Sequence, residues 1–197
     1  MNILSISPHA DDSEFGAGAT LRKLVENDNV VCIMIFNDDP ELVKEGIRAA
    51  KVIGATTKII PMQGRIYGST RQKILDHLII YRTFYSPDIV FVPSRTDIHQ
   101  DHQVITNEAI RAFRESTILG YNEPWNQNNV ITNYFVEINE GDFYKKMDAL
   151  EEYKSRKHKP YFSWEYQKSI VRCNGIKIKV EYAEAFEAIQ IIGNKTI

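Results

Sequence analysis

An uninterrupted apolar run reads Val30-Val31-Cys32-Ile33-Met34-Ile35-Phe36. It is rich in branched residues and lacks polar alternation, which is typical of a strand buried on both faces. A similar run lies at residues 89–92, and shorter ones lie at residues 3–7 and 58–61. The sequence therefore predicts several short strands that other layers of structure cover.

Segments with apolar residues at helical spacing separate these runs. They lie at residues 17–26, 41–53 and 70–85, and Pro40 and Gly54 mark the start and end of the second. Strands that alternate with helices in this way form right-handed βαβ units and a parallel sheet. We therefore predict an α/β fold, a Rossmann-like three-layer sandwich with a mostly parallel central sheet, as a single domain over residues 1–197.

The pattern weakens after about residue 118. An Asn-rich stretch at 120–133 predicts a long loop, and residues 133–138 and 142–154 predict a strand and a helix. An aromatic cluster follows at 161–166, and residues 176–192 hold strand-type residues around an Ala/Glu-rich centre.

The composition is that of a globular protein with a buried core. Hydrophobic residues make up 43% of the 197 residues and charged residues 25%. The formal net charge of −2 argues against a nucleic-acid partner. Two cysteines make no disulfide framework, and we find neither a signal peptide nor an apolar stretch of about 20 residues that could span a membrane. We expect a cytoplasmic protein.

Metal-competent side chains directly follow the first predicted strand, in the segment Pro8-His9-Ala10-Asp11-Asp12-Ser13-Glu14. In parallel sheets, ligands bind at the carboxyl ends of the strands. A histidine with carboxylates at such a place can supply part of a zinc site and a general base for its water. The alternative is that Asp11 and Asp12 only cap the following helix.

A second set, His99-Gln100-Asp101-His102, follows the strand at 89–92. Three of the five histidines thus lie at two strand ends, whereas His77 and His158 are interpreted as surface or structural residues. Three protein ligands with an open fourth position are typical of catalytic zinc. We therefore predict a site with two histidines and one aspartate, in which the remaining His and Asp transfer protons or orient a ligand ring.

Together, the two segments resemble the motifs of the LmbE-like, or PIG-L, family of zinc deacetylases. Its Pro-His-Pro-Asp-Asp motif, with an acidic residue and a glycine-rich helix start, is similar to residues 8–20. Its His-x-Asp-His motif is similar to residues 99–102. Residues 45–54, 86–93 and, more loosely, 182–186 also fit, so the resemblance covers most of the chain.

The resemblance implies removal of the acetyl group from a small N-acetylglucosamine-type sugar or glycoside. It implies one zinc, or another divalent ion, held by His9, Asp12 and His102. It also implies that Asp11 is the general base and that His99 stabilises the oxyanion or protonates the leaving amine. By the same resemblance, Asp101 orients a histidine, with His102 as the favoured partner, and the chain forms a homo-oligomer.

The sequence departs from the family pattern at four places. Ala10 replaces a proline, and Ala19 replaces a glycine. Leu42 stands where many relatives have an arginine, and Ser155-Arg156 stands where a Ser-Gln pair is common. The last two departures concern the substrate more than the reaction.

The candidate substrate contacts are Glu14, Arg95 and Trp125. Arg65 and Arg95 are candidates for an anionic part of the substrate, and Arg95 is favoured because it lies on the predicted metal loop. Further aromatic candidates for stacking on a sugar are Tyr121, Tyr161, Phe162 and Trp164, and for each of them a place in the core or at an interface is an equal alternative.

Other functions stay open. Gly16-Ala17-Gly18 at a helix start is similar to a dinucleotide fingerprint, but Leu21 occupies the third glycine position and the turn is too long. Close packing of helix on sheet is the better interpretation of these glycines. A binding protein with a vestigial site would not require Asp11, whereas a zinc hydrolase for another amide of a small glycoside fits the same residues.

Overall fold

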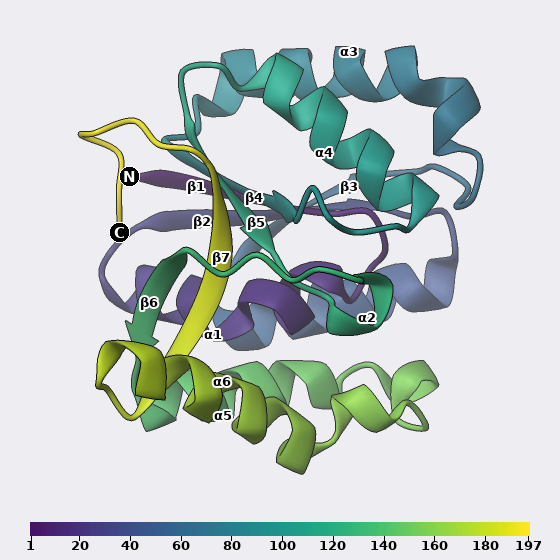
Figure 1. The fold of residues 1–197 in the computed structure, drawn as a ribbon. Helices are drawn as coiled ribbons and strands as arrows, with labels where there is room; N and C mark the ends of the chain where they lie inside the picture. The colour runs from purple at the N-terminus through teal and green to yellow at the C-terminus, as the bar shows by residue number, and fades with distance from the viewer.

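The computed structural model describes all 197 residues, in which strands and helices alternate through most of the chain (Figure 1). The strands are β1 Asn2–Ser7, β2 Val30–Phe36, β3 Thr56–Ile60, β4 Ile89–Pro93, β5 Thr117–Tyr121, β6 Tyr134–Ile138 and β7 Tyr182–Gln190. The α-helices are α1 Asp12–Glu26, α2 Pro40–Ile53, α3 Tyr67–Tyr85, α4 Gln100–Ala112, α5 Glu140–Glu151 and α6 Trp164–Ile178. Three short 3-10 helices are η1 Pro124–Asn126, η2 Lys154–Arg156 and η3 Pro160–Phe162.

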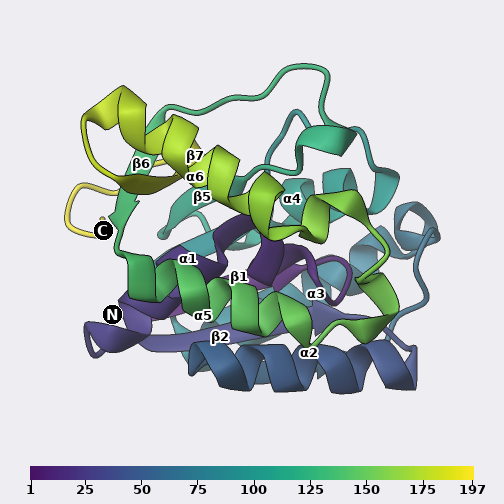
Figure 2. The same cartoon turned by 90° about the horizontal axis from the view of Figure 1, so that it is seen from below.

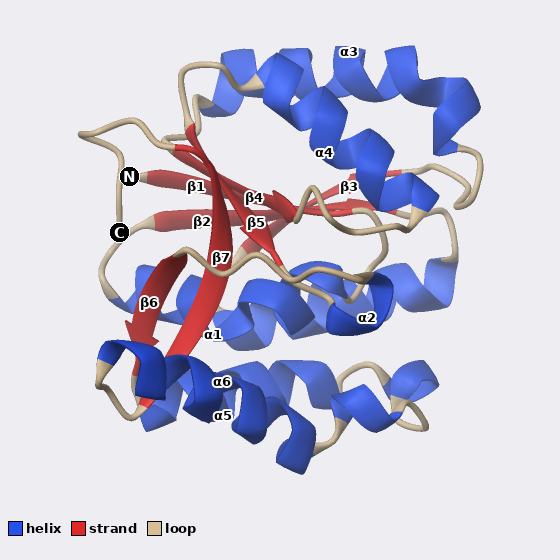
Figure 3. Ribbon diagram, viewed as in Figure 1, coloured by secondary structure: helices blue, strands red, loops and turns tan.

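The seven strands form one sheet in the order β3-β2-β1-β4-β5-β7-β6. The first five strands pair in parallel, whereas β7 is antiparallel to both β5 and β6. Helices α3 and α4 cover one face of the sheet, and α1 and α2 cover the other (Figure 3). The predicted three-layer α/β sandwich with a mostly parallel sheet is confirmed.

Alternate side chains of the central strands enter two separate apolar cores. In β2, Ile33 packs in the core shared with α1 and α2, whereas the adjacent Met34 packs in the core shared with α3 and α4. Successive side chains of a strand point to opposite faces, so a strand covered on both sides needs apolar residues at every position. This requirement explains the uninterrupted run at residues 30–36.

The second half of the chain adds a further layer. β6 and β7 curve away from the parallel strands, α5 packs against α1 and α2, and α6 packs against β7 (Figures 1 and 2). The connection from α5 to α6 contains η2 and η3. None of the helices combines the length and the apolar character needed to cross a membrane.

One prediction for the second half is wrong. β5 continues to Tyr121, so the predicted loop at 120–133 begins later. A β-carbon on Gly120 would lie only 2.9 Å from Ser94 Cα, so this glycine allows two neighbouring backbones to approach closely inside the sheet. The strand-type residues at 176–192 contain β7, whereas residues 176–178 end α6.

Helix α1 begins at Asp12, five residues before its predicted start at Ala17. Its first turn is therefore built from the polar motif itself. Gly16 lies in the next turn, and a β-carbon there would come within 2.7 Å of three atoms of the Tyr121 side chain. The glycine thus allows α1 to pack closely on β5, which confirms the packing interpretation of the Gly-Ala-Gly segment.

We expect Gly16→Ala to lower the free energy of unfolding by about 1–3 kcal/mol, because the added methyl group must displace a fully buried tyrosine. Urea unfolding followed by circular dichroism measures the change. Gly68→Ala on α3 is the matched control, since a β-carbon at Gly68 meets nothing within 4 Å. Equal stability of the two variants would contradict the packing argument.

Candidate active site and metal centre

The carboxyl ends of β1 and β4 lie side by side, because the two strands pair in parallel with Ser5 opposite Phe91. β1 leads through a short connection into α1, and β4 leads into α4. His9 and Asp12 come from the first connection and the start of α1, and His102 lies in the first turn of α4. The fold therefore brings together three predicted ligands that are up to 93 positions apart in the sequence.

The donor atoms of these three side chains form a nearly equilateral triangle. His9 Nδ1 lies 3.3 Å from Asp12 Oδ2 and 3.1 Å from His102 Nε2, and His102 Nε2 lies 3.4 Å from Asp12 Oδ2. Zinc bonds of about 2.0–2.2 Å in a tetrahedron require ligand atoms about 3.3–3.5 Å apart. The triangle fits one such ion, with the fourth position left for water or substrate.

The electrostatics of the triangle also suit a cation. Burial opposes ionisation of Asp12, but His102 and His9 outweigh it and hold the pKa of Asp12 well below its usual value. Despite burial, Asp12 and Asp101 raise the pKa of His9 to about 9. Likewise Asp12 and then Glu123 raise the pKa of His102 above its usual value, against the opposing effect of burial. A divalent ion must displace these protons when it binds.

Other donors lie close by. Two further sets of three, His9-His99-His102 and Asp12-His102-Glu123, have ligand atoms within 4.8 Å of one another. His99, however, uses Nδ1 to accept the Asp101 N–H at 3.2 Å and so caps α4. A neutral ring that accepts through Nδ1 carries its proton on Nε2. Burial, and then the rings of His102 and His9, lower the pKa of His99, which favours this neutral donor form.

The expected partner of His102 needs correction. His102 Nδ1 lies 2.8 Å from Oδ2 of Asp97, not of Asp101, and both side chains of this pair are 1% exposed. Adjacent residues of a helix point in different directions, so Asp101 cannot face His102. Asp101 instead lies 3.3 Å from Nε2 of His9 and accepts the Arg65 N–H at 2.6 Å.

Asp97 was missed although a local signal exists. Its Oδ1 accepts the His99 N–H at 2.8 Å, which is the two-residue-on hydrogen bond of an Asx turn. One carboxylate thus fixes both the path of the loop and the ring of His102. An aspartate two residues before the first histidine of a motif was the available clue.

Asp11 is the N-cap residue of α1, but its side chain makes no capping hydrogen bond. This observation disfavours the alternative that Asp11 serves only as a cap. The carboxylate lines the same cavity as the three ligands, and its Oδ2 lies 3.5 Å from Nε of Arg156. Burial, and then the charge of Asp12, raise the pKa of Asp11 above its usual value.

The cavity over these residues has a volume of about 560 Å³. Besides the three ligands, Asp11 and His99, its wall contains Gly64, Arg65, Glu123, Trp125, Asn126, Arg156, Lys159 and Tyr161. The indole of Trp125 stacks on the ring of Tyr161, with centroids 3.8 Å apart and planes inclined by 14°. This pair gives the polar cavity one flat aromatic wall.

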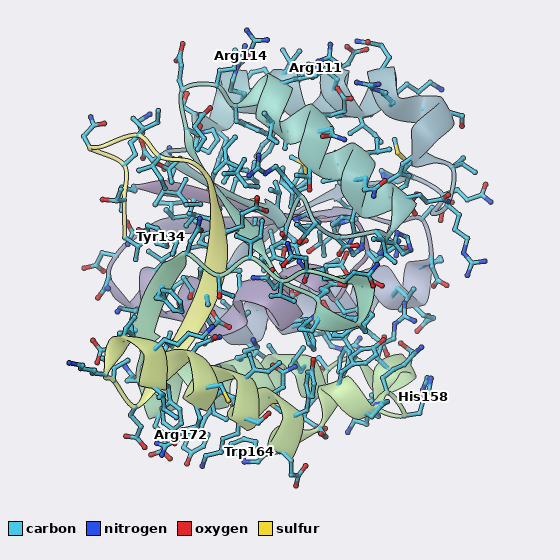
Figure 4. All side chains as sticks on the ribbon, in the orientation of Figure 1. Arg111, Arg114, Tyr134, His158, Trp164 and Arg172 are labelled. Carbon is cyan, nitrogen blue, oxygen red and sulfur yellow. The ribbon has the colours of Figure 1, made fainter.

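Two predicted substrate contacts are not in this wall. Glu14 is fully buried in α1, and Arg95 donates through Nε to Oε1 of Glu187 at 2.6 Å. Glu187 of β7 also accepts the backbone N–H of Arg95, so Arg95 is bonded to β7 through both its backbone and its side chain. Of the aromatic candidates, Tyr121 and Phe162 are buried. Trp164 stacks on Tyr144 at the lower surface (Figure 4).

Glu123 is the wall residue that the sequence pattern did not reveal. It is 2% exposed, its Oε2 lies 3.9 Å from His102 Nδ1, and its Oε1 has no hydrogen-bond partner. Burial, and then Asp12, raise the pKa of Glu123 well above its usual value. Glu123 follows β5, so the strand-end rule would have located it if that strand had been recognised.

A Rossmann-like sandwich that carries a His-Asp-His donor triangle beside an uncommitted carboxylate is the arrangement of a metal-dependent hydrolase. The model of the PIG-L family, described as GlcNAc-PI de-N-acetylase, matches residues 4–113, which is more than half of the chain. The chain therefore belongs to the PIG-L family and is a hydrolase that acts on amide bonds.

Solved structures share the fold. The conserved protein TT1542 from Thermus thermophilus is 21% identical, with a TM-score of 0.84 over 98% of this chain and 96% of its own. The N,N'-diacetylchitobiose deacetylase from Pyrococcus horikoshii is 23% identical, with a TM-score of 0.78 over 94% and 82%. GalB, the 4-carboxy-2-hydroxymuconate hydratase from Pseudomonas putida, is 16% identical, with a TM-score of 0.79 over the full length of both chains.

We expect Asp97→Asn to weaken zinc binding by about 10–100-fold, because an amide no longer holds the proton and orientation of the His102 ring as a carboxylate does. Competition with a chromogenic zinc chelator measures the affinity. Asp148→Asn is the control, since this acid of α5 is 60% exposed. An unchanged affinity in Asp97→Asn would contradict the assignment of Asp97.

Glu14 should make stability depend on pH. Burial raises its pKa to about 8, whereas an unfolded glutamate has a pKa of about 4.3. A raised carboxyl pKa means that the folded protein binds a proton that the unfolded chain releases. Stability is therefore lost as pH rises from about 4.3 to about 8, by up to about 1.4 kcal/mol per pH unit.

We expect Glu14→Gln to remove this loss, so its stability advantage over the wild type grows from about pH 5 to about pH 8. Urea unfolding of the metal-free protein across this range measures it. Glu165→Gln, at an exposed position on α6, should show no such trend. Parallel pH profiles for wild type and Glu14→Gln would rule out a neutral buried carboxyl.

Proposed function

We propose that the chain is a single deacetylase domain, residues 1–197, that binds one zinc ion and removes the acetyl group from an N-acetylglucosamine-type sugar or glycoside. The products are acetate and a free amine. The observation that carries the proposal is the triangle of His9 Nδ1, Asp12 Oδ2 and His102 Nε2, with edges of 3.1–3.4 Å. Family membership and the deacetylase among the structural neighbours support the reaction.

The donor set supports zinc over magnesium or calcium, which prefer oxygen ligands. Another divalent transition metal would fit the same triangle. When bound, zinc polarises the amide carbonyl and lowers the pKa of its water to about 7. The remaining tasks, which are proton transfer and stabilisation of developing charge, fall to side chains of this chain.

Asp11 is the proposed general base. It lines the cavity next to the triangle, makes no capping bond, and has a raised pKa, which makes its carboxylate a better proton acceptor. The proton that it takes from the attacking water is then available for the leaving amine. An amine departs only when protonated, so one carboxylate can serve both steps.

His99 is the proposed donor to the oxygen of the tetrahedral intermediate. Its Nδ1 accepts the Asp101 N–H, which leaves the ring proton on Nε2, and the ring lines the same cavity as the ligands. The lowered pKa of His99 favours a neutral ring that donates one hydrogen bond. Asp97 and Asp101 hold the rings of His102 and His9.

A sugar ring is supported by the stacked Trp125 and Tyr161, which offer an apolar plane beside polar groups. The alternative of a dinucleotide site has little support, because Gly16 is packed against Tyr121 and cannot face a pyrophosphate. A zinc hydrolase for another amide of a small glycoside remains the second candidate. It is separated from the first by whether acetate is the acid released.

We expect His102→Ala to lose zinc and activity together, whereas Asp11→Asn keeps stoichiometric zinc and loses turnover by about 10²–10⁴-fold. The reason is that His102 supplies a donor atom, while Asp11 supplies only proton transfer. Metal content is measured by mass spectrometry, and turnover by acetate release from a panel of N-acetyl sugars. His158→Ala is the control, because this histidine is exposed at the periphery (Figure 4).

Near wild-type turnover in Asp11→Asn would refute the base assignment. Full zinc occupancy in His102→Ala would refute the ligand set. Release of an acid other than acetate would favour the second candidate.

A further inference from the structure

Three basic side chains line the cavity although no step of the proposed reaction uses them. Arg65 comes from the connection between β3 and α3, Arg156 from η2, and Lys159 from the residue before η3. Arg65 is distant in sequence from Arg156 and Lys159, so the fold brings the three cations to one cavity. They belong to the same cavity as the metal triangle.

Little within the protein neutralises these cations. Neither Arg65 nor Lys159 has an acidic partner within 4.0 Å or a side-chain hydrogen bond. Arg156 has only the 3.5 Å contact with Asp11, and its Nε is buried without a hydrogen bond. Arg95, which follows β4, shows the contrast, because its Nε donates to Glu187 Oε1 at 2.6 Å.

The backbone holds two of these residues in place. Arg65 has φ 69°, in the left-handed region that a side chain normally avoids. Both of its backbone groups are bonded to the start of α4, the N–H to Asp101 Oδ2 at 2.6 Å and the carbonyl to Gln100 Nε2 at 2.7 Å. These two hydrogen bonds offset the backbone strain and fix the position of the Arg65 backbone, from which the side chain extends.

Arg156 is anchored in a comparable way. The preceding Ser155 donates its N–H and hydroxyl to the two carboxylate oxygens of Glu45 at 3.2 and 2.6 Å. Tyr153 donates its hydroxyl to the carbonyl of Ala10, next to the proposed base. Segment 153–156 is thus tied both to α2 and to the polar motif after β1, so Arg156 stays at the cavity.

The acidic groups of the site are engaged elsewhere. Asp12, Asp97 and Asp101 contact the rings of His9 and His102. The side chains of Arg65 and Lys159 have no counter-charge within 4.0 Å, and cations that are not neutralised in a partly enclosed space concentrate ligands of the opposite charge.

We infer that the substrate carries, besides its acetamido group, an anionic group that Arg65 and Lys159 bind, with Arg156 shared between this anion and Asp11. The inference rests on the proposed deacetylation, and it narrows the substrate to a negatively charged N-acetyl glycoside. A phosphate and a carboxylate present the same chemistry to these cations. Both are therefore tested.

The first test is binding without metal, which does not depend on the reaction. Isothermal titration measures the affinity of chelator-treated protein for glucosamine, for glucosamine 1-phosphate, and for muramic acid, which is a carboxylate-bearing glucosamine. We expect at least one anionic compound to bind at least tenfold more tightly than glucosamine, and the advantage to shrink as salt rises. Equal affinities would overturn the inference.

The double variant Arg65→Gln/Lys159→Gln should bind the anionic compound at least tenfold more weakly than the wild type does, and so lose the preference over glucosamine. Lys154→Gln is the matched control, because this lysine is exposed on η2 and outside the cavity wall. Unfolding midpoint and zinc content establish that the double variant is intact. Retention of the full anion preference by an intact double variant would assign the binding elsewhere and overturn the inference.

The second test is acetate release by the zinc-loaded protein from the N-acetylated forms of the same three compounds. We expect kcat/KM to be higher for an anionic substrate than for the neutral one. In the double variant this difference should disappear, mainly because KM for the anionic substrate rises. The better of the phosphate and the carboxylate identifies the anion. If no compound releases acetate while anion binding persists, the proposed function fails and the anion site stands.

Discussion

The structure depends on the parallel pairing of β1 with β4. This register sets Ile3 opposite Ile89 and Ser5 opposite Phe91, so both strands end together. Apolar layers cover the pair on both faces, and the polar motifs follow the strands at their carboxyl ends. The 3.1 Å separation of His9 Nδ1 and His102 Nε2 is a consequence of this register, since each histidine follows its strand by a short and well-bonded segment.

The site concentrates acidic groups that would repel one another without compensation. Asp11, Asp12, Asp97, Asp101 and Glu123 all lie around two imidazoles. In the metal-free protein, protons on His9 and His102 supply the missing positive charge, as their raised pKa values indicate. A divalent ion exchanges for these protons at nearly constant charge. The three donor atoms already lie 3.1–3.4 Å apart without a metal.

The sequence predicts the parallel half of the fold because β-type runs and helices alternate there, and it predicts the ligands because they follow two of those runs. The prediction fails where the same residue type fits two different structural roles. The predicted loop at 120–133 includes Gly120, which instead lies in β5 and allows a close approach to Ser94. Asp101 was a reasonable partner for His102 by sequence, yet helix geometry turns it to His9 and leaves the role to Asp97. The pairing of Arg95 with Glu187 depends on β7 lying beside β5, and strand-type residues at 176–192 do not indicate which strand they pair with.

The two halves of the chain contribute differently to the site. The region that matches the family, residues 4–113, contains the three donors, Asp11, His99 and both orienting aspartates. Glu123 and Trp125, together with Arg156, Lys159 and Tyr161, come from beyond it and form much of the cavity wall. The metal-competent groups therefore follow the parallel strands, whereas most of the other wall residues come from the β5–β6 and α5–α6 connections, with Arg65 from the β3–α3 connection as an exception. The second half is packed firmly on the first, because α5 contacts both α1 and α2, and Phe143 and Tyr153 enter the core that these helices share. This separation of the metal-competent groups from most of the wall gives a physical reason why one fold accommodates deacetylases and a hydratase among its structural neighbours.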